Sequence, residues 1–131
     1  MALATWLETQ EEVLWVNYPG LASSKYKELA DKYLPTGQSG LVTFGTKGGY
    51  EAAKTIVDNS KVFSLLANIG DTKSLIIHPA STTNQQLTEE QQLAAGVSSD
   101  LIRLSVGLED IEDLKTDLKE AFSKIPKELL V

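Results

Sequence analysis

Residues 101–110 read LIRLSVGLED, and this stretch decides the fold that the sequence predicts. Side chains of a strand alternate between two faces. The face expected to pack against helices carries Ile102, Leu104, Val106 and Leu108. The opposite face carries Leu101, Arg103, Ser105 and Gly107. Arg103 is therefore expected to project from the face away from the helices, which is bare unless another part of the molecule covers it.

Arg103 has two interpretations, and the residues alone leave both open. A guanidinium is costly to bury without a carboxylate or phosphate, and no such partner is expected nearby until Glu109 and Asp110. Arg103 can be a solvated strand arginine, loosely paired with a surface carboxylate and of little energetic weight. It can instead be a receptor that grips a carboxylate or phosphate through two parallel hydrogen bonds.

Composition excludes several classes of protein. A chain of 131 residues with 42% hydrophobic and 23% charged residues fits one globular domain, residues 1–131. No apolar run approaches the ~20 residues of a membrane span. The net charge of −6, without a basic stripe, argues against nucleic-acid binding. The absence of cysteine excludes disulfides and cysteine nucleophiles, and it agrees with a cytoplasmic protein.

Strand and helix patterns alternate along the chain. Helices are expected from residue 2, after Ser23 and Ser24, at 50–59, at 88–95 and from 111 to 122. Strands are expected at 13–16, 40–46, 74–79 and 101–108, while 61–68 fits either type. This order predicts an α/β (α+β) two-layer sandwich, with about four mostly antiparallel strands and helices on one face.

No self-contained active site is visible in the sequence. His78, the only histidine, has no companion ligands at metal spacing and is interpreted as a hydrogen-bonded histidine at a strand end. No G-x-S-x-G nucleophile elbow occurs. Gly48 and Gly49 lack the spacing of a phosphate-binding loop and are expected to make a tight turn before a helix. Taken by themselves, the residues indicate a soluble α/β domain with one candidate binding residue, Arg103.

The order of the motifs along the chain indicates more about function than the individual residues do. VNYPGL (16–21), LVTFGTKGG (41–49), LLANIGDTKSLIIHPASTT (65–83) and LIRLSVGLEDIEDLKTDL (101–118) follow one another. This series resembles the C-terminal domain of the Cys/Met-metabolism family of pyridoxal-phosphate enzymes, over about residues 2–122. The VNYPGL and Asn-Ile-Gly-Asp segments look closest to the O-acetylhomoserine sulfhydrylase branch. The resemblance implies the small C-terminal domain of a fold-type I enzyme.

The resemblance also implies roles for residues. In the family, the arginine at Arg103 holds the α-carboxylate of an amino-acid substrate, and Asn68 and Thr83 are expected to line the same pocket. The Schiff-base lysine and the cofactor domain of the family lie N-terminal to this segment, and no lysine here matches that motif. We therefore expect pyridoxal 5'-phosphate in the intact enzyme, with the enzyme's own N-terminal domain as partner and a homotetrameric assembly. The chain alone is expected to bind no cofactor and to be inactive.

The activity implied by the resemblance is γ-replacement on O-acetyl-L-homoserine, which makes homocysteine or methionine. Within the family, the reactions of methionine gamma-lyase and cystathionine gamma-synthase are alternatives. An alternative of another class is a non-catalytic module that binds a carboxylate ligand or a protein through the face that carries Arg103.

Overall fold

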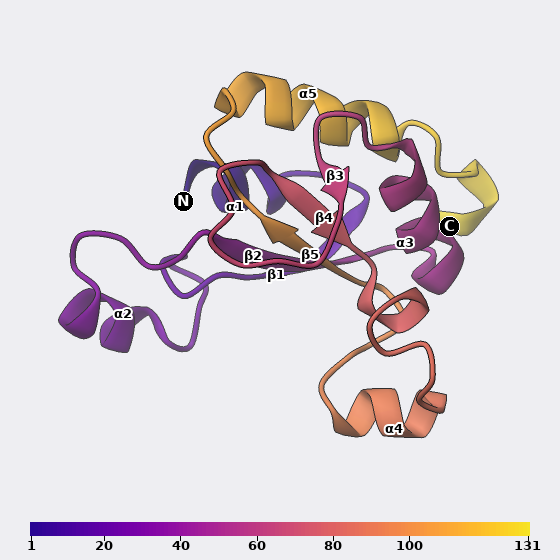
Figure 1. Cartoon of the computed structure of the whole chain (residues 1–131), viewed down its shortest axis with the longest axis horizontal. Helices are drawn as coiled ribbons and strands as arrows, with labels where there is room; N and C mark the ends of the chain where they lie inside the picture. Colours follow the sequence, from indigo (N-terminus) through magenta and orange to yellow (C-terminus); the bar gives the residue numbers. More distant parts are fainter.

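The computed structural model describes residues 1–131 and contains one five-stranded sheet with helices packed on it (Figure 1). The strands are β1 (Val13–Asn17), β2 (Leu41–Thr46), β3 (Ser64–Leu65), β4 (Leu75–Ile77) and β5 (Leu101–Ser105). The α-helices are α1 (Ala2–Leu7), α2 (Lys27–Tyr33), α3 (Gly49–Asn59), α4 (Glu89–Ala94) and α5 (Ile111–Phe122). Two 3₁₀ turns, η1 (Pro79–Ser81) and η2 (Lys127–Leu129), complete the chain. No helix is both long and apolar enough to cross a membrane.

The strand order is β1-β2-β5-β4-β3, so β5 lies in the middle of the sheet. All pairs are antiparallel except β3 with β4, which is parallel. The predicted α/β architecture with a mostly antiparallel sheet is confirmed. The additional strand is β3, two residues within the segment 61–68 that fitted either type.

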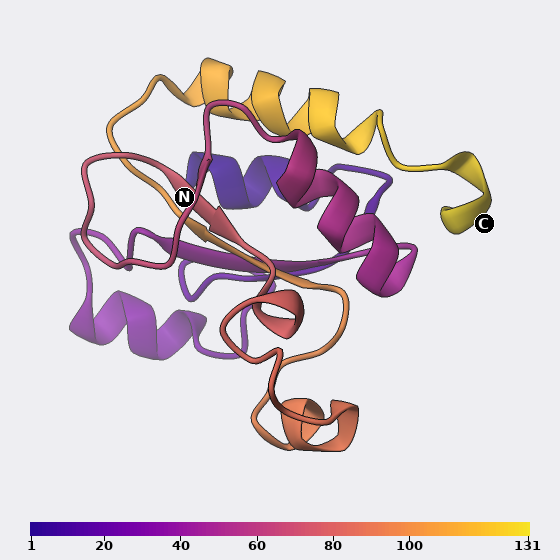
Figure 2. The same cartoon turned by 45° about the vertical axis from the view of Figure 1, so that its right-hand side comes forward.

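One face of the sheet is closed by helices. In both views, α1, α3 and α5 lie on the same side of the sheet, while α2 and α4 lie on the other side (Figure 2). Phe44, Ile102 and Leu104 project into the helical layer and are completely buried. Burial of each such side chain stabilises the fold by roughly 1.5–3 kcal/mol. We call this the helical face of the sheet, and the opposite one the second face.

The predicted alternation fails at one end of β5. Leu108 was expected to lie on the helical face but is 83% exposed. The reason is that β5 ends at Ser105, and residues beyond it leave the plane of the sheet. The helix expected directly after Ser23 and Ser24 begins later, because α2 begins at Lys27 after Tyr26, without a side-chain cap.

Buried Asp117 joins α5 to the chain before β3. Its carboxylate accepts hydrogen bonds from the backbone N–H groups of Lys61, Val62 and Phe63, at 2.8–3.0 Å. A buried carboxylate is tolerated only when donors surround it, as here. The anchor fixes where the chain enters β3 and then turns over the sheet.

Candidate carboxylate site on the second face of the sheet

Arg103 is the only arginine of the chain and lies at the middle of the central strand. Its register partners are Thr43 on β2 and Ile77 on β4, and Thr43 is paired in turn with Asn17 on β1. Paired residues in a sheet point to the same side. One row across the second face is therefore Asn17, Thr43, Arg103 and Ile77.

The guanidinium of Arg103 has no partner within the chain. Its Nε is buried and makes no hydrogen bond, and none of the three ion pairs includes it. The carboxylates close to it in sequence are engaged elsewhere. Glu109 bonds to Ser74, and Asp110 caps α5 by accepting from Glu112 N–H. The surface carboxylate that would pair with a solvated strand arginine is therefore absent from the chain.

A third carboxylate near Arg103, Asp100, is also occupied. Its Oδ2 accepts a hydrogen bond from Trp15 Nε1 at 3.0 Å. The indole lies over Gly45, where a Cβ would overlap both the ring and the Asp100 carboxylate. The arrangement needs glycine at 45, and it directs Asp100 toward β1 rather than toward Arg103.

An open cleft of about 400 Å³ lies on the second face. Its floor is formed by Asn17, Leu41 and Thr43, and its wall by the segment that leads to and from α2, including Tyr26 and Gln38. Thr43 is the residue directly paired with Arg103. The cleft is lined largely by neutral polar groups, which suits a small polar ligand, and it reaches the strand residue paired with Arg103.

Asn68 is brought to the same face as Arg103. It lies in the exposed segment between β3 and β4, and its backbone carbonyl accepts a hydrogen bond from Ser105 Oγ at 2.9 Å. Ser105 is two residues from Arg103 on β5, on the same side of the strand. The Asn68 amide bonds only locally, accepting from Ile69 N–H and donating to Asp71 at 3.5 Å.

Thr83 is not linked to Arg103 or Asn68 by a hydrogen bond. It is exposed, follows η1, and its hydroxyl donates to Asn84 Oδ1 at 2.9 Å. Its neighbours Ser81 and Thr82 both donate to the carbonyl of His78. Of the predicted site residues, Arg103 and Asn68 therefore share a region of the second face, and the role of Thr83 stays a prediction.

His78 is a structural residue at the end of β4, as predicted. Its Nε2 is 2.7 Å from the Ser99 carbonyl, which can only accept, so Nε2 carries a proton, and Nδ1 lies 2.9 Å from Ser81 Oγ. Burial lowers the pKa of His78, an effect that the carbonyl of Ser99 and the charge of Asp100 oppose. The ring is therefore neutral in the fold and connects β4 to the turn before β5.

The interaction between Ser74 and Glu109 was not predicted from the sequence. The Glu109 carboxylate accepts from both the backbone N–H and the hydroxyl of Ser74, with the hydroxyl at 2.6 Å. Burial acts to raise the pKa of Glu109, but the hydrogen bonds from Ser74 outweigh it and the pKa is lowered. Glu109 is thus held as a carboxylate at neutral pH, which does not suit it to act as a general acid.

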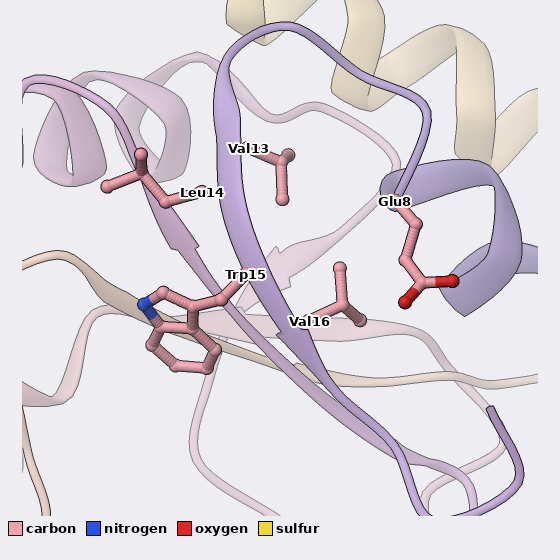
Figure 3. A pocket seen from close by; sticks show the side chains of 5 residues that line it. All are labelled: Glu8, Val13, Leu14, Trp15 and Val16. Atoms are coloured by element: carbon pink, nitrogen blue, oxygen red, sulfur yellow. The ribbon is translucent and has the colours of Figure 1, made fainter. Parts of the chain in front are cut away.

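A hollow elsewhere on the surface offers no catalytic pair. A hollow between α1 and β1 is lined by Glu8, Val13, Leu14, Trp15 and Val16. Val13 and Val16 point toward the side of Glu8, whereas Leu14 and Trp15 point away from it (Figure 3). A single carboxylate among apolar groups forms no catalytic pair. No cluster of three or more potential metal ligands exists either. Arg103 and its surroundings are the best candidate site.

In comparisons with known proteins, this chain matches one part of longer proteins. Residues 1–123 match the family model described as Cys/Met metabolism PLP-dependent enzyme. The chain is 54% identical over 121 residues to O-acetyl-L-homoserine sulfhydrylase 1 of Thermus thermophilus, covering 92% of this chain and 29% of the relative. It is 44% identical over 135 residues to homocysteine/cysteine synthase of Saccharomyces cerevisiae, covering 95% and 30%.

A solved structure shares the fold. The crystal structure of a putative O-acetylhomoserine (thiol)-lyase from Campylobacter jejuni superposes with a TM-score of 0.85 at 48% identity. The match covers 93% of this chain and 29% of that one, which contains a pyridoxyl-lysine monophosphate. The chain therefore spans less than a third of the length of these relatives.

Proposed function

The chain belongs to the Cys/Met metabolism family of PLP-dependent enzymes, and from this premise we propose that it supplies the substrate-carboxylate site of an O-acetyl-L-homoserine sulfhydrylase. The observation that carries the proposal is the unpartnered Arg103 guanidinium on the second face, where its strand partner Thr43 lines an open polar cleft. Two relatives named above support the choice of O-acetylhomoserine as the substrate.

In the proposed reaction, sulfide or a thiol replaces acetate on the γ-carbon of O-acetyl-L-homoserine. The carbon–sulfur bond forms, the carbon–oxygen bond breaks, and acetate leaves with the bonding electrons. Pyridoxal phosphate, when bound in the intact enzyme, supplies the electron sink for this chemistry. Arg103 binds the substrate α-carboxylate through two parallel hydrogen bonds, which fixes the orientation of the amino acid. Asn68 borders the same ligand, and Thr83 contributes to access.

The residues of this chain do not build a pyridoxal phosphate site by themselves. None of its lysines is buried, and the buried donor without a partner belongs to Arg103, whose planar group suits a carboxylate. We therefore propose that the isolated chain neither binds the cofactor tightly nor turns over substrate. The complete enzyme would combine it with a cofactor domain of the same protein, in a cytoplasmic homotetramer.

The experiment uses the full-length protein that contains this chain. Arg103→Ala is expected to lower kcat/KM for O-acetyl-L-homoserine about a hundredfold, because charge-assisted hydrogen bonds contribute roughly 1.5–3 kcal/mol each. Arg103→Lys serves as the control that keeps the charge but not the two parallel bonds, and should lie between. The absorbance of the bound cofactor should not change. A change in kcat/KM of Arg103→Ala below about threefold would refute the carboxylate role.

The products identify the reaction class. With sulfide present, acetate and homocysteine should appear in equal amounts. Release of ammonia in the absence of any thiol would instead identify an elimination, and no turnover of any amino acid by the full-length protein would favour a non-catalytic module.

A further inference from the structure

The segment from Asn68 to Ser74, here called the strap, is held at both ends by the strand and turn that carry Arg103. At the first end, Ser105 Oγ donates to the Asn68 carbonyl at 2.9 Å. Ser105 is 8% exposed, and its own backbone lies in the sheet between Leu41 and Leu75. Residues two apart on a strand are ~7 Å apart and lie on the same side, so this bond fastens the strap to the side of β5 that carries Arg103.

The second end is fastened by the residues that follow β5. Ser74 is fully buried and donates through N–H and hydroxyl to Glu109, while its hydroxyl accepts from Gly107 N–H at 2.8 Å. Leu108 N–H donates to the Thr72 carbonyl at 2.9 Å. A Cβ on Gly107 would overlap the backbone of residues 72–74. The turn after β5 and the end of the strap thus pack backbone against backbone.

Between these two anchors the strap depends on nothing else for its place beside Arg103. The Asn68 side chain bonds only to its neighbours Ile69 and Asp71, and Lys73 N–H bonds only to Asp71. Ile69 is 69% exposed and packs on no core residue. Local bonds shape the strap, but they do not set its distance from β5.

We infer that Ser105 and Glu109 are positioning residues that hold Asn68 beside Arg103, so that both reach the same substrate. The inference rests on the proposed function for the identity of that substrate, an amino acid with a free α-carboxylate. Neither Ser105 nor Glu109 touches the ligand. Each acts through the strap, Ser105 directly at Asn68 and Glu109 by fixing Ser74.

The test measures the strap and the substrate separately in the full-length protein. Ser105→Ala and Glu109→Gln should each speed amide hydrogen exchange of residues 69–74 at least fivefold. Both should raise KM for O-acetyl-L-homoserine about five- to twentyfold while kcat changes less than threefold, because binding is lost and the reacting atoms are untouched. Matched controls are Ser60→Ala, whose hydroxyl bonds within the helical layer, and Glu112→Gln, which is exposed on α5.

Arg103→Ala separates this inference from the proposed function. It should raise KM without changing the exchange of the strap. If Arg103→Ala raises KM but Ser105→Ala and Glu109→Gln do not, the positioning role is overturned and the carboxylate role stands. The same holds if the exchange accelerates without any rise in KM, since the two residues would then serve stability alone. If Arg103→Ala leaves KM unchanged, the proposed function fails, and the exchange data still decide what fastens the strap.

Discussion

The two faces of the sheet differ in whether a buried polar group is left without a hydrogen-bond partner. On the helical face, apolar side chains of β2 and β5 are completely buried against α1, α3 and α5. On the second face, the same two strands present Thr43 and Arg103, and the Arg103 Nε is buried without an acceptor. The first face is complete within these residues. The second lacks an acceptor for its one guanidinium, which is why we propose it as the face that binds substrate.

The largest expected effect comes from opening the helical face. Leu104→Ala should lower the free energy of unfolding by about 2–5 kcal/mol, because it leaves a cavity in a completely buried region. Urea denaturation followed by circular dichroism measures this loss. Leu108→Ala, at an exposed position of the same segment, is the matched control and should cost far less. Equal losses at both positions would show that burial against the helices is not what makes Leu104 important for stability.

A smaller effect, which depends on pH, is expected at Glu109, whose carboxylate anchors Ser74 at the end of the strap. Hydrogen bonds to Ser74 lower the pKa of Glu109 in the folded state, so the carboxylate stabilises the fold above its unfolded pKa. This contribution is lost as the pH falls through the lower, folded-state pKa. Glu109→Gln should therefore cost roughly 1 kcal/mol at pH 7 and little in strong acid. Denaturation of both proteins across pH tests this, and a constant difference would contradict it.

The smallest effect on stability is expected at Arg103 itself. Arg103→Met should change the free energy of unfolding by less than about 0.5 kcal/mol, because the guanidinium has no partner to lose. The same denaturation experiment measures it. A loss comparable with that of Leu104→Ala would make Arg103 a structural element and would remove the contrast between the faces.

Alternation within 101–105 was enough to predict which face of β5 is buried and where Arg103 points. It could not predict the strap, because the acceptor for Ser105 is a backbone carbonyl, and a backbone carbonyl leaves no mark on residue type. Leu108 was misplaced for a related reason, since apolar alternation continues beyond the last residue that pairs in the sheet.

Asp117 did leave a signal in the sequence. It follows Leu114 by one helical turn, within the apolar stripe predicted for the last helix. An acid in such a stripe indicates buried donors, and three backbone N–H groups provide them. The donors themselves, at 61–63, could not be located, because that segment fitted both strand and helix.

The turn that packs backbone against backbone at Gly107 has a consequence for chain length. Arg103 and Ser105 point to the same side of β5 because one residue separates them, and Gly107 meets the backbone of residues 72–74 because of its distance from the end of the strand. Inserting or deleting a single residue between Arg103 and Ser105 would turn Ser105 to the opposite face of the strand, and a change after Ser105 would move Gly107 away from residues 72–74. A substitution in this stretch changes one side chain, whereas a change in its length would displace the proposed carboxylate site and its support together.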